Sequence, residues 1–312
     1  MGLGQGAGGD HLTPLTAEVA LKAYEAIRHR LPAAVPAARP GQHCETLADL
    51  ADDFDVFLLD AFGVLNIGEI AIPDTPQRIA ALKAAGKRVF VVSNAAGAPH
   101  AALVRKYRRI GYDFAPEEII TSRATLLAGL QARRDLHWGL IATRSSGFED
   151  LEGLNLTYLE DDPAAYDAVE GVLMIGSADW TESRQSLLEA ALQRRPRPVL
   201  VGNPDIVAPR ETGFSAEPGH FAHRLADRSG VVPEFFGKPF GNIFDLAFAR
   251  IGTIDRARVL MVGDSLHTDI LGAQTAGLAS ALITRYGFFA GQDAGRAIAE
   301  TGIMPDFIVA RP

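Results

Sequence analysis

The sequence predicts an α/β protein in which a doubly wound parallel sheet is interrupted by a second α/β unit. Three observations support this fold class. Strand and helix patterns alternate between residues 54 and 112, a shorter alternation lies between 123 and 225, and the first pattern resumes beyond residue 235. Strands and helices that alternate at this spacing form parallel strands with helices packed on the sheet. The interruption indicates that the middle unit is an insertion.

The first half of the core contains two strands and two helices. The run FDVFLLD (54–60) is almost continuously apolar, which is typical of a strand buried on both faces. The run RVFVVSN (88–94) has the same character. Apolar residues at helical spacing predict one helix within 73–87 and another within 100–112.

The rest of the chain repeats this alternation. In the insertion we expect strands at 137–143, 171–176 and 197–203 and a helix at 181–195. In the second half of the core we expect a loop and helix within 235–252, a strand at 258–265, a helix at 268–277 and a strand at 280–287. We therefore divide the chain into an N-terminal extension (1–47), an α/β core (48–122 and 226–312) and an inserted α/β cap domain (123–225).

The N-terminal extension has two parts. Its glycine-rich start follows no strand and lacks a GK[ST] sequence, so we expect a disordered terminus without function. Apolar positions at helical spacing then predict a helix over 15–31, and the proline-rich stretch after it breaks that helix.

Composition excludes several classes of protein. The chain has 312 residues, a net charge of −8 and 47% hydrophobic residues, which suits a globular protein of roughly two domains. The negative charge argues against nucleic acid or an anionic membrane as a partner. One cysteine, Cys44, excludes an intramolecular disulfide and favours a reducing compartment. We find neither a membrane-spanning stretch nor a signal peptide, so a cytoplasmic location is expected.

Polar residues stand where the predicted parallel strands end. They are Asp60, Ser93, Asn94, Lys238 and Asp264. Each alone is more often a turn, cap or solvated residue. Ligands bind at the carboxyl ends of such strands, however, and together these residues supply carboxylates for a hard cation, donors for phosphoryl oxygens and an ammonium group. Phosphoryl transfer requires that combination.

The order of these residues resembles the four motifs of the haloacid dehalogenase superfamily. The motifs here read DAFGVL (60–65), VVSNAAG (91–97), GKP (237–239) and GDSLHTDILGA (263–273). The insertion lies between the second and third motifs and contains Asn203-Pro204-Asp205, which is similar to the class IIA group of sugar phosphatases, nitrophenylphosphatases and pyridoxal phosphatases. The resemblance extends from about residue 52 to 310. It implies a Rossmann-like core, a cap domain and a phosphatase activity.

The resemblance also implies a mechanism for small phosphorylated metabolites. Asp60 would attack phosphorus and form an aspartyl-phosphate. Mg²⁺ would bind Asp60, Asp264 and the backbone carbonyl of Phe62. Asp269 would complete the metal site directly or through water, although a helix N-cap role is an equal alternative.

The remaining motif residues would hold the substrate. Ser93 and the N–H of Asn94 would bind phosphoryl oxygens, and Lys238 would neutralise the nucleophile and the transferring group. Asn203 and Asp205 would position the substrate under the cap, with an ordinary Asn-Pro turn as the alternative. A homodimer formed through the cap is a further expectation from the resemblance.

One position departs from the family pattern. Phosphatases of this superfamily normally have a second Asp two residues after the nucleophile as general acid and base, and Phe62 stands there instead. We therefore expect weak turnover, best on esters whose leaving group needs no proton. Two alternatives stay open: a 2-haloacid dehalogenase, which has a similar DAYG start, and a degenerate site that only binds a phosphometabolite. The two carboxylates of GDSLHTD favour a metal-dependent phosphatase over a dehalogenase.

Overall fold

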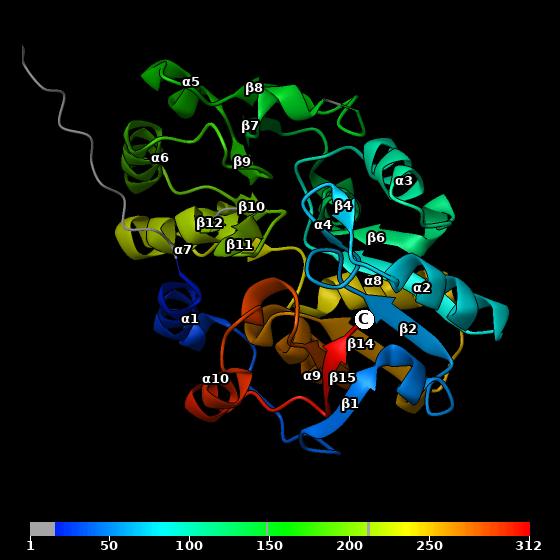
Figure 1. The fold of residues 1–312 in the computed structure, drawn as a ribbon. Coiled ribbons are helices and arrows are strands. Elements are labelled where there is room, and N and C mark those ends of the chain that lie inside the picture. Colours follow the sequence, from blue (N-terminus) through cyan, green and yellow to red (C-terminus); the bar gives the residue numbers. More distant parts are fainter. Residues whose placement is uncertain (1–15, 148, 211–212) are drawn as a thin grey trace, which may run out of the picture.

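The computed structural model describes residues 16–147, 149–210 and 213–312. They form two parallel sheets with helices on both faces, joined through two connections (Figure 1). This architecture confirms the predicted α/β fold with a cap. The glycine-rich start, for which we expected disorder, lies outside the described residues.

The larger sheet is the core of the molecule, and its strands are all parallel. In spatial order the strands are β1 (Gln42–Thr46), β16 (Phe307–Arg311), β15 (Ala279–Ile283), β14 (Val259–Gly263), β2 (Val56–Leu59), β5 (Arg88–Ser93) and β6 (Ile119–Thr121). The central positions of β14, β2 and β5 place the ends of the apolar runs next to one another.

Helices cover both faces of this sheet, which explains why its strands are apolar throughout. Side chains alternate along β2. Phe57 and Leu59 pack against the helices on one face of the sheet, and Val56 and Leu58 pack against the helices on the other face. The first face carries α2 (Thr75–Ala84) and α3 (His100–Arg109), and the second carries α8 (Gly241–Ile251) and α9 (Leu271–Ala276).

The N-terminal segment joins the core more closely than its sequence indicates. Helix α1 (Ala17–Ala26) packs against α9 and α10 (Ala294–Thr301) in one apolar cluster. Strand β1 forms the edge of the core sheet beside β16. Its sequence, QHCET, is polar and largely exposed, as suits an edge strand, and apolar periodicity does not detect it.

The cap is built on the smaller parallel sheet. Its strands, in spatial order, are β13 (Glu234–Phe235), β10 (Val199–Val201), β9 (Gly171–Met174), β7 (His137–Ile141) and β8 (Asn155–Tyr158). One face packs on α5 (Pro163–Ala168), α6 (Glu182–Arg194) and α7 (Pro218–Ser229), and the other packs on α4 (Ser122–Gly129). Because β13 pairs with β10 although it lies beyond residue 225, we propose that the cap continues to Phe235.

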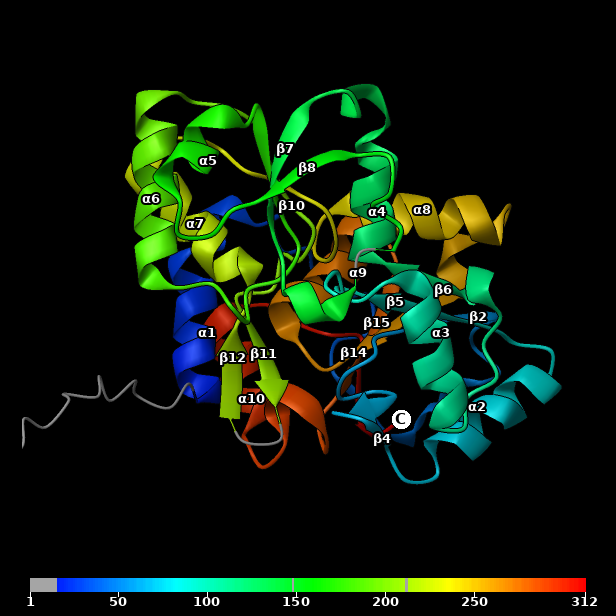
Figure 2. The ribbon, with the colours of Figure 1, turned by 90° about the horizontal axis from the view of Figure 1, so that it is seen from above.

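Two short antiparallel hairpins project from the sheets. One pairs β3 (Asn66–Ile67) with β4 (Ile70–Ala71) beside the core, and the other pairs β11 (Val207–Arg210) with β12 (Gly213–Ala216). Figure 2 shows the β11–β12 hairpin extending from the cap toward α1 and α10. Ile206 and Val207 pack in the same cluster as those helices, so this connection fixes part of the cap to the core.

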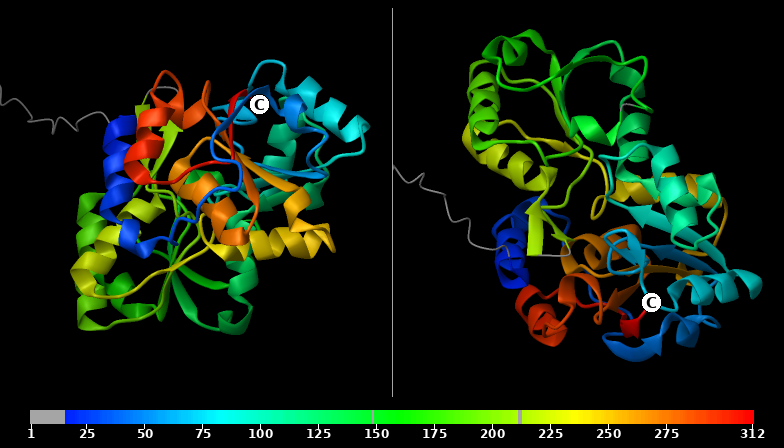
Figure 3. Two further views of the ribbon diagram at one scale, coloured as in Figure 1. Left: turned by 90° about the horizontal axis from the view of Figure 1, so that it is seen from below. Right: turned by 45° about the horizontal axis from the view of Figure 1, so that its top comes forward.

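Helix α1 also contacts the cap. Figure 3 shows it beside the cap helix α7 and the core helix α10 from two sides. Arg30, just after α1, forms an ion pair with Asp227 of α7 and donates a hydrogen bond to the carbonyl of His223 at 3.2 Å. The N-terminal segment therefore bridges the two domains.

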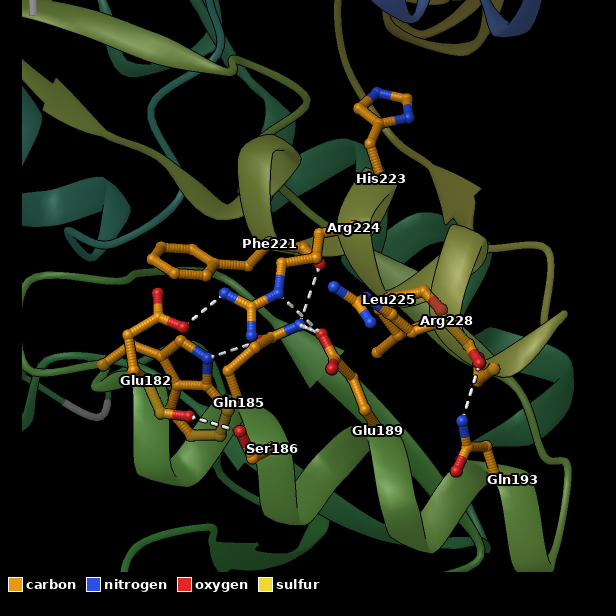
Figure 4. A network of polar contacts seen from close by, with 12 residues as sticks. Glu182, Gln185, Ser186, Glu189, Gln193, Phe221, His223, Arg224, Leu225 and Arg228 are labelled. Carbon is orange, nitrogen blue, oxygen red and sulfur yellow. Dashed lines mark hydrogen bonds and ion pairs between the residues drawn. The ribbon is translucent and has the colours of Figure 1, made fainter.

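Within the cap, α6 and α7 are joined by a network of polar contacts (Figure 4). The Gln185 amide nitrogen donates to Glu189 at 2.8 Å and to the carbonyl of Phe221 at 3.1 Å. Arg224 of α7 pairs with Glu189 at 3.0 Å and with Glu182.

None of the helices in the described ranges has the length and apolarity that crossing a membrane requires.

Candidate active site

Three adjacent core strands place their terminal polar residues at one edge of the sheet. Asp60 follows β2, Ser93 ends β5 and Asp264 follows β14. The backbone N–H of Asp60 donates to the carbonyl of Val262 at 2.8 Å, which continues the ladder between β2 and β14. The expected convergence at the carboxyl ends of the strands is present in the structure.

Lys238 reaches this group from the loop between β13 and α8. Its ammonium lies 2.7 Å from Asp60 Oδ1 and 2.6 Å from Asp269 Oδ1, and its side chain is only 1% exposed. Burial alone would lower the pKa of Lys238, but the charges of Asp269 and Asp60 outweigh it and raise the pKa above its usual range. Lys238 is therefore fully charged and holds one oxygen of each carboxylate.

Three carboxylates surround this single ammonium. Each of Asp60, Asp264 and Asp269 offers an oxygen, and the three oxygens lie within 4.8 Å of one another. Burial, together with the charges of its two neighbours, raises the pKa of Asp264 well above its usual value. Burial also raises the pKa of Asp269 to about 6, although Lys238 opposes the shift.

This oxygen-rich set fits a hard divalent cation. With all three carboxylates ionised, one lysine leaves two negative charges unbalanced, and oxygen ligands are those that such cations prefer. The loop around Asp264 is tight, since a Cβ at Gly63, whose φ is +75°, would lie 2.3 Å from Asp264 Oδ2. The site residues thus suit the divalent metal that the motifs imply.

Asp269 also organises the loop that carries Asp264. It lies in a π-helical turn (Leu266–Ile270), and its Oδ2 accepts hydrogen bonds from the N–H groups of Asp264 at 3.1 Å and Ser265 at 3.0 Å. These bonds come from residues that precede Asp269, and Ser265 is the N-cap of the turn. Asp269 is therefore not the N-cap residue considered as the alternative; its carboxylate holds the loop that carries Asp264 from within the turn.

The side chain of Asn94 is fully occupied by protein partners. Its amide nitrogen donates to Asp205 Oδ1 at 2.7 Å and to the carbonyl of Lys238 at 2.9 Å. Its oxygen accepts from the N–H of Lys238 at 2.7 Å and from the Ser122 hydroxyl at 3.0 Å. Any contact of Asn94 with a substrate must come from its backbone, while the side chain fixes the cap to the GKP loop.

The Asn203-Pro204-Asp205 segment is a shaped turn that faces the core. Asn203 Oδ1 accepts from the N–H of Asp205 at 3.0 Å, and its amide nitrogen donates to Glu217 at 3.1 Å. Helix α7 approaches so closely that a Cβ at Gly219 would lie 2.1 Å from the carbonyl oxygen of Pro204. The segment is both a turn and a wall of the site, so the two readings of its sequence do not exclude each other.

A cavity of about 730 Å³ lies between the core and the cap. Eight of the sequence-predicted residues line it: Asp60, Phe62, Ser93, Asn94, Asn203, Asp205, Lys238 and Asp264. Asp269 does not line it and is 0% exposed. The volume is in the range typical of pockets for small molecules.

Among the cavity residues that sequence reasoning did not single out is Tyr24 of α1. Its hydroxyl accepts a hydrogen bond from the N–H of Ile206 at 3.2 Å, and its ring stacks on His267 with the centroids 4.8 Å apart. His267 in turn lies 2.6 Å from Glu25, the neighbour of Tyr24. The only signal was the apolar periodicity of residues 15–31, which indicates a helix and not a site. No histidine among the described residues lines the cavity.

Comparison with known families places the motifs in context. Residues 57–151 match the family described as haloacid dehalogenase-like hydrolase, and residues 235–310 match a second description, HAD-hydrolase-like. The two matches flank most of the cap, as the interrupted strand and helix pattern predicts.

Similar proteins carry phosphatase names. A glycerol-3-phosphate phosphatase from Gallus gallus is 31% identical over 306 residues, which cover 88% of this chain and 96% of that protein. An acid sugar phosphatase from Staphylococcus aureus is 26% identical over 227 residues, with coverage of 72% and 84%. A crystal structure of a possible sugar phosphatase from Cytophaga hutchinsonii has a TM-score of 0.76 at 25% identity and covers 87% of this chain and 98% of its own.

Proposed function

This chain belongs to the haloacid dehalogenase-like hydrolases, and from that membership we propose that it hydrolyses glycerol phosphate or sugar phosphates with Mg²⁺ through an aspartyl-phosphate on Asp60. At the coarser level the chain is a phosphatase of small phosphate esters of this family. The observation that carries the proposal is the group of three carboxylates and one buried lysine beneath the cap.

The proposed chemistry divides among the residues as follows. Lys238 binds Asp60 Oδ1, so the second oxygen of Asp60 attacks phosphorus. The Ser93 hydroxyl and the N–H of Asn94 hold phosphoryl oxygens. Asp60 and Asp264 would hold the divalent cation, with Asp269 contributing directly or through water, and the cation would supply positive charge to the transferring phosphoryl group.

Two features support a substrate of sugar-phosphate size. The relatives are named for glycerol 3-phosphate and for sugars, and the cavity volume of about 730 Å³ leaves space for a small polar alcohol beside the phosphoryl group. The cavity wall mixes polar cap residues such as Asn203 with apolar ones such as Val207. A polar alcohol portion suits that wall.

Phosphate release tests the proposal directly. We expect Mg²⁺-dependent release of phosphate from glycerol 3-phosphate and p-nitrophenyl phosphate, and a loss on the order of 10⁴-fold or more in Asp60→Asn, because the nucleophile is removed. Circular dichroism checks that the variant folds. Phosphate release that continues unchanged in Asp60→Asn would contradict the mechanism.

The same assay separates the other two functions. Phe62 provides no general acid, which favours a site that binds a phosphate ester without hydrolysing it. For such a site, calorimetry should detect binding of the ester while no phosphate is released. A dehalogenase predicts metal-independent halide release from 2-haloacids. We expect neither result.

A further inference from the structure

We propose that Asp205 of the cap serves as the general acid and base of the reaction. Phe62, which stands where the family normally has that acid, carries no group that can give or take a proton. The inference rests on the proposed function, since it assigns a further catalytic residue to the same reaction. A step in which an alkoxide leaves phosphorus needs a proton donor, and the hydrolysis of an aspartyl-phosphate needs a proton acceptor for water.

The carboxyls of the cavity wall leave one candidate for this role. Asp60 and Asp264 belong to the acidic group at the proposed metal site. Glu69 is paired with Lys106 at 3.0 Å and its side chain is 64% exposed. Glu217 accepts hydrogen bonds inside the cap from Asn203 and Ser215. Among the described residues that line the cavity, Asp205 is the remaining carboxyl.

The geometry holds Asp205 in place from two domains. Asn94 of the core donates to Asp205 Oδ1 at 2.7 Å, and Asn94 is itself fixed to both backbone groups of Lys238. The next residue of the cap, Ile206, donates its N–H to the Tyr24 hydroxyl. Asp205 Oδ1 is therefore committed to Asn94, whereas Oδ2 is available to carry a proton.

The electrostatic environment favours the protonated form at neutral pH. Burial raises the pKa of Asp205 to about 8, although the hydrogen bond from Asn94 and the charge of Lys238 oppose the shift and the charge of Asp60 adds to it. Asn94 contacts both Asp205 and the backbone of Lys238, whose ammonium lies 2.7 Å from Asp60, so Asp205 lies close to the nucleophile. A pKa close to the working pH suits a group that must both give and take a proton.

The two half-reactions balance as follows. Asp60 forms a bond to phosphorus, the bond from phosphorus to the ester oxygen breaks with its electron pair on that oxygen, and the oxygen takes the proton of Asp205. Water then attacks the phosphorus of the aspartyl-phosphate and gives a proton to the Asp205 carboxylate. The bond from phosphorus to Asp60 breaks, which returns free Asp60, protonated Asp205 and inorganic phosphate.

The leaving group distinguishes catalysis by Asp205 from a structural role. Asp205→Asn keeps an oxygen for the Asn94 hydrogen bond and loses the proton. We expect kcat/KM for glycerol 3-phosphate to fall about 100- to 10,000-fold, and kcat/KM for p-nitrophenyl phosphate to fall less than about 10-fold, because nitrophenolate leaves without a proton. Equal losses on the two esters would overturn the proposal.

Two further readouts follow from the same variant. In wild type, kcat/KM for glycerol 3-phosphate should fall as the pH rises through about 8, where Asp205 loses its proton, and this decrease should be absent in Asp205→Asn. Loss of the base should also slow dephosphorylation, so p-nitrophenyl phosphate should give a burst of one nitrophenolate per active site. A pH profile that keeps its basic limb in the variant, without a burst, would contradict the assignment.

A second carboxyl tests whether the function can be moved. Phe62→Asp places an acid where the family normally has one. We expect it to change the wild-type rate on glycerol 3-phosphate by less than about 10-fold and to raise the rate of Asp205→Asn by about 100-fold or more. If Phe62→Asp changed the rate by the same factor in wild type and in Asp205→Asn, residues 62 and 205 would not share a role.

A buried carboxyl outside the cavity supplies the control. Asp306 is 6% exposed and accepts hydrogen bonds from Ser280, so Asp306→Asn makes the same chemical change at a hydrogen-bonded carboxyl. It should leave the ratio of the two kcat/KM values unchanged. If the proposed function itself fails, wild type releases phosphate from neither ester; if only the role of Asp205 fails, wild type is active and the variant loses the same factor on both.

Discussion

A cluster of polar residues in the cap and another at the junction of core and cap are built differently. In the cap, Gln185, Glu189 and Arg224 join α6 to α7, and each charged group meets a partner on the neighbouring helix (Figure 4). At the junction of core and cap, Lys238 stands alone among Asp60, Asp264 and Asp269. In the cap cluster each charged group has a partner of opposite charge, whereas at the junction three carboxylates share one ammonium group.

The difference shows where folding and function are in conflict. Buried like charges cost free energy, so a fold gains nothing by gathering three carboxylates around one lysine. Such a group is expected where a cation or a charged substrate completes it. The cap network needs no further component. The two clusters therefore predict different responses to substitution.

The first substitution removes one metal ligand from the unmatched cluster. Asp264→Asn should lower phosphate release by about 1,000-fold or more, since it removes a charged ligand of the cation. In wild type, Mg²⁺ at 100 times its Kd should stabilise the fold by about 2.7 kcal/mol, and this stabilisation should vanish in the variant. Differential scanning calorimetry with and without Mg²⁺ measures it. A variant that keeps the full Mg²⁺-dependent shift would show that the cation binds elsewhere.

The second substitution removes a cation from each cluster in turn. Lys238→Met leaves Asp60 and Asp269 without their counter-ion and should lower the free energy of unfolding by about 3–5 kcal/mol. Arg224→Met is the matched change in the cap and should cost about 1 kcal/mol, because Arg224 is 30% exposed and its buried partner Glu189 keeps the hydrogen bond from Gln185. Urea unfolding compares the two variants. Equal losses would remove the distinction between the clusters.

The third prediction concerns pH and the cap alone. Burial, reinforced by the charge of Arg30, lowers the pKa of His223 from 6.5 to about 4. The unfolded chain therefore binds a proton at higher pH than the folded chain does, and stability is lost as the pH falls below 6.5. We expect a loss of about 2 kcal/mol between pH 7.5 and pH 5 from this group.

His223→Phe should remove that part of the pH dependence, because the stack on Phe235 is kept and the titrating ring is lost. Urea unfolding at the two pH values measures it. The slope of kcat against pH should not change, since His223 does not line the cavity. An unchanged pH dependence of stability in the variant would contradict the assignment to His223.

The smallest effect should come from the contact between α1 and the cap loop. Tyr24→Phe keeps the stack on His267 and removes the acceptor of the Ile206 N–H, which should cost about 1 kcal/mol of stability and lower kcat/KM about 5- to 10-fold. Tyr166→Phe is the matched control, because Tyr166 is buried and its hydroxyl donates to the carbonyl of Glu160 inside the cap. It should cost similar stability and leave kcat/KM unchanged. Equal kinetic effects would mean that Tyr24 acts only through stability.

The same two regions show what a sequence can and cannot reveal. Fully buried strands such as β2 and β14 were predictable because both faces are apolar, and the residues that end them fall next to one another in a parallel sheet. Strand β1 was not, since it is a polar edge strand, nor was β13, which has only two residues. Local periodicity does not detect either kind of strand.

The site divides in the same way. Asp60, Lys238 and Asp264 stand in recognisable motifs, and their convergence follows from sheet topology. The place of Tyr24 follows instead from how α1 packs between α10 and α7, which no local pattern encodes. The occupation of the Asn94 side chain by Lys238 and Asp205 likewise depends on long-range contacts.

The proposed mechanism requires that Asp60 becomes phosphorylated during turnover. Rapid acid quenching of the enzyme with substrate and Mg²⁺, followed by borohydride reduction and peptide mass spectrometry, detects this intermediate. We predict that residue 60 is recovered as homoserine, the reduction product of an aspartyl-phosphate, and that the product is absent without substrate. Steady phosphate release with residue 60 unmodified, or with the label on another residue, would contradict the account.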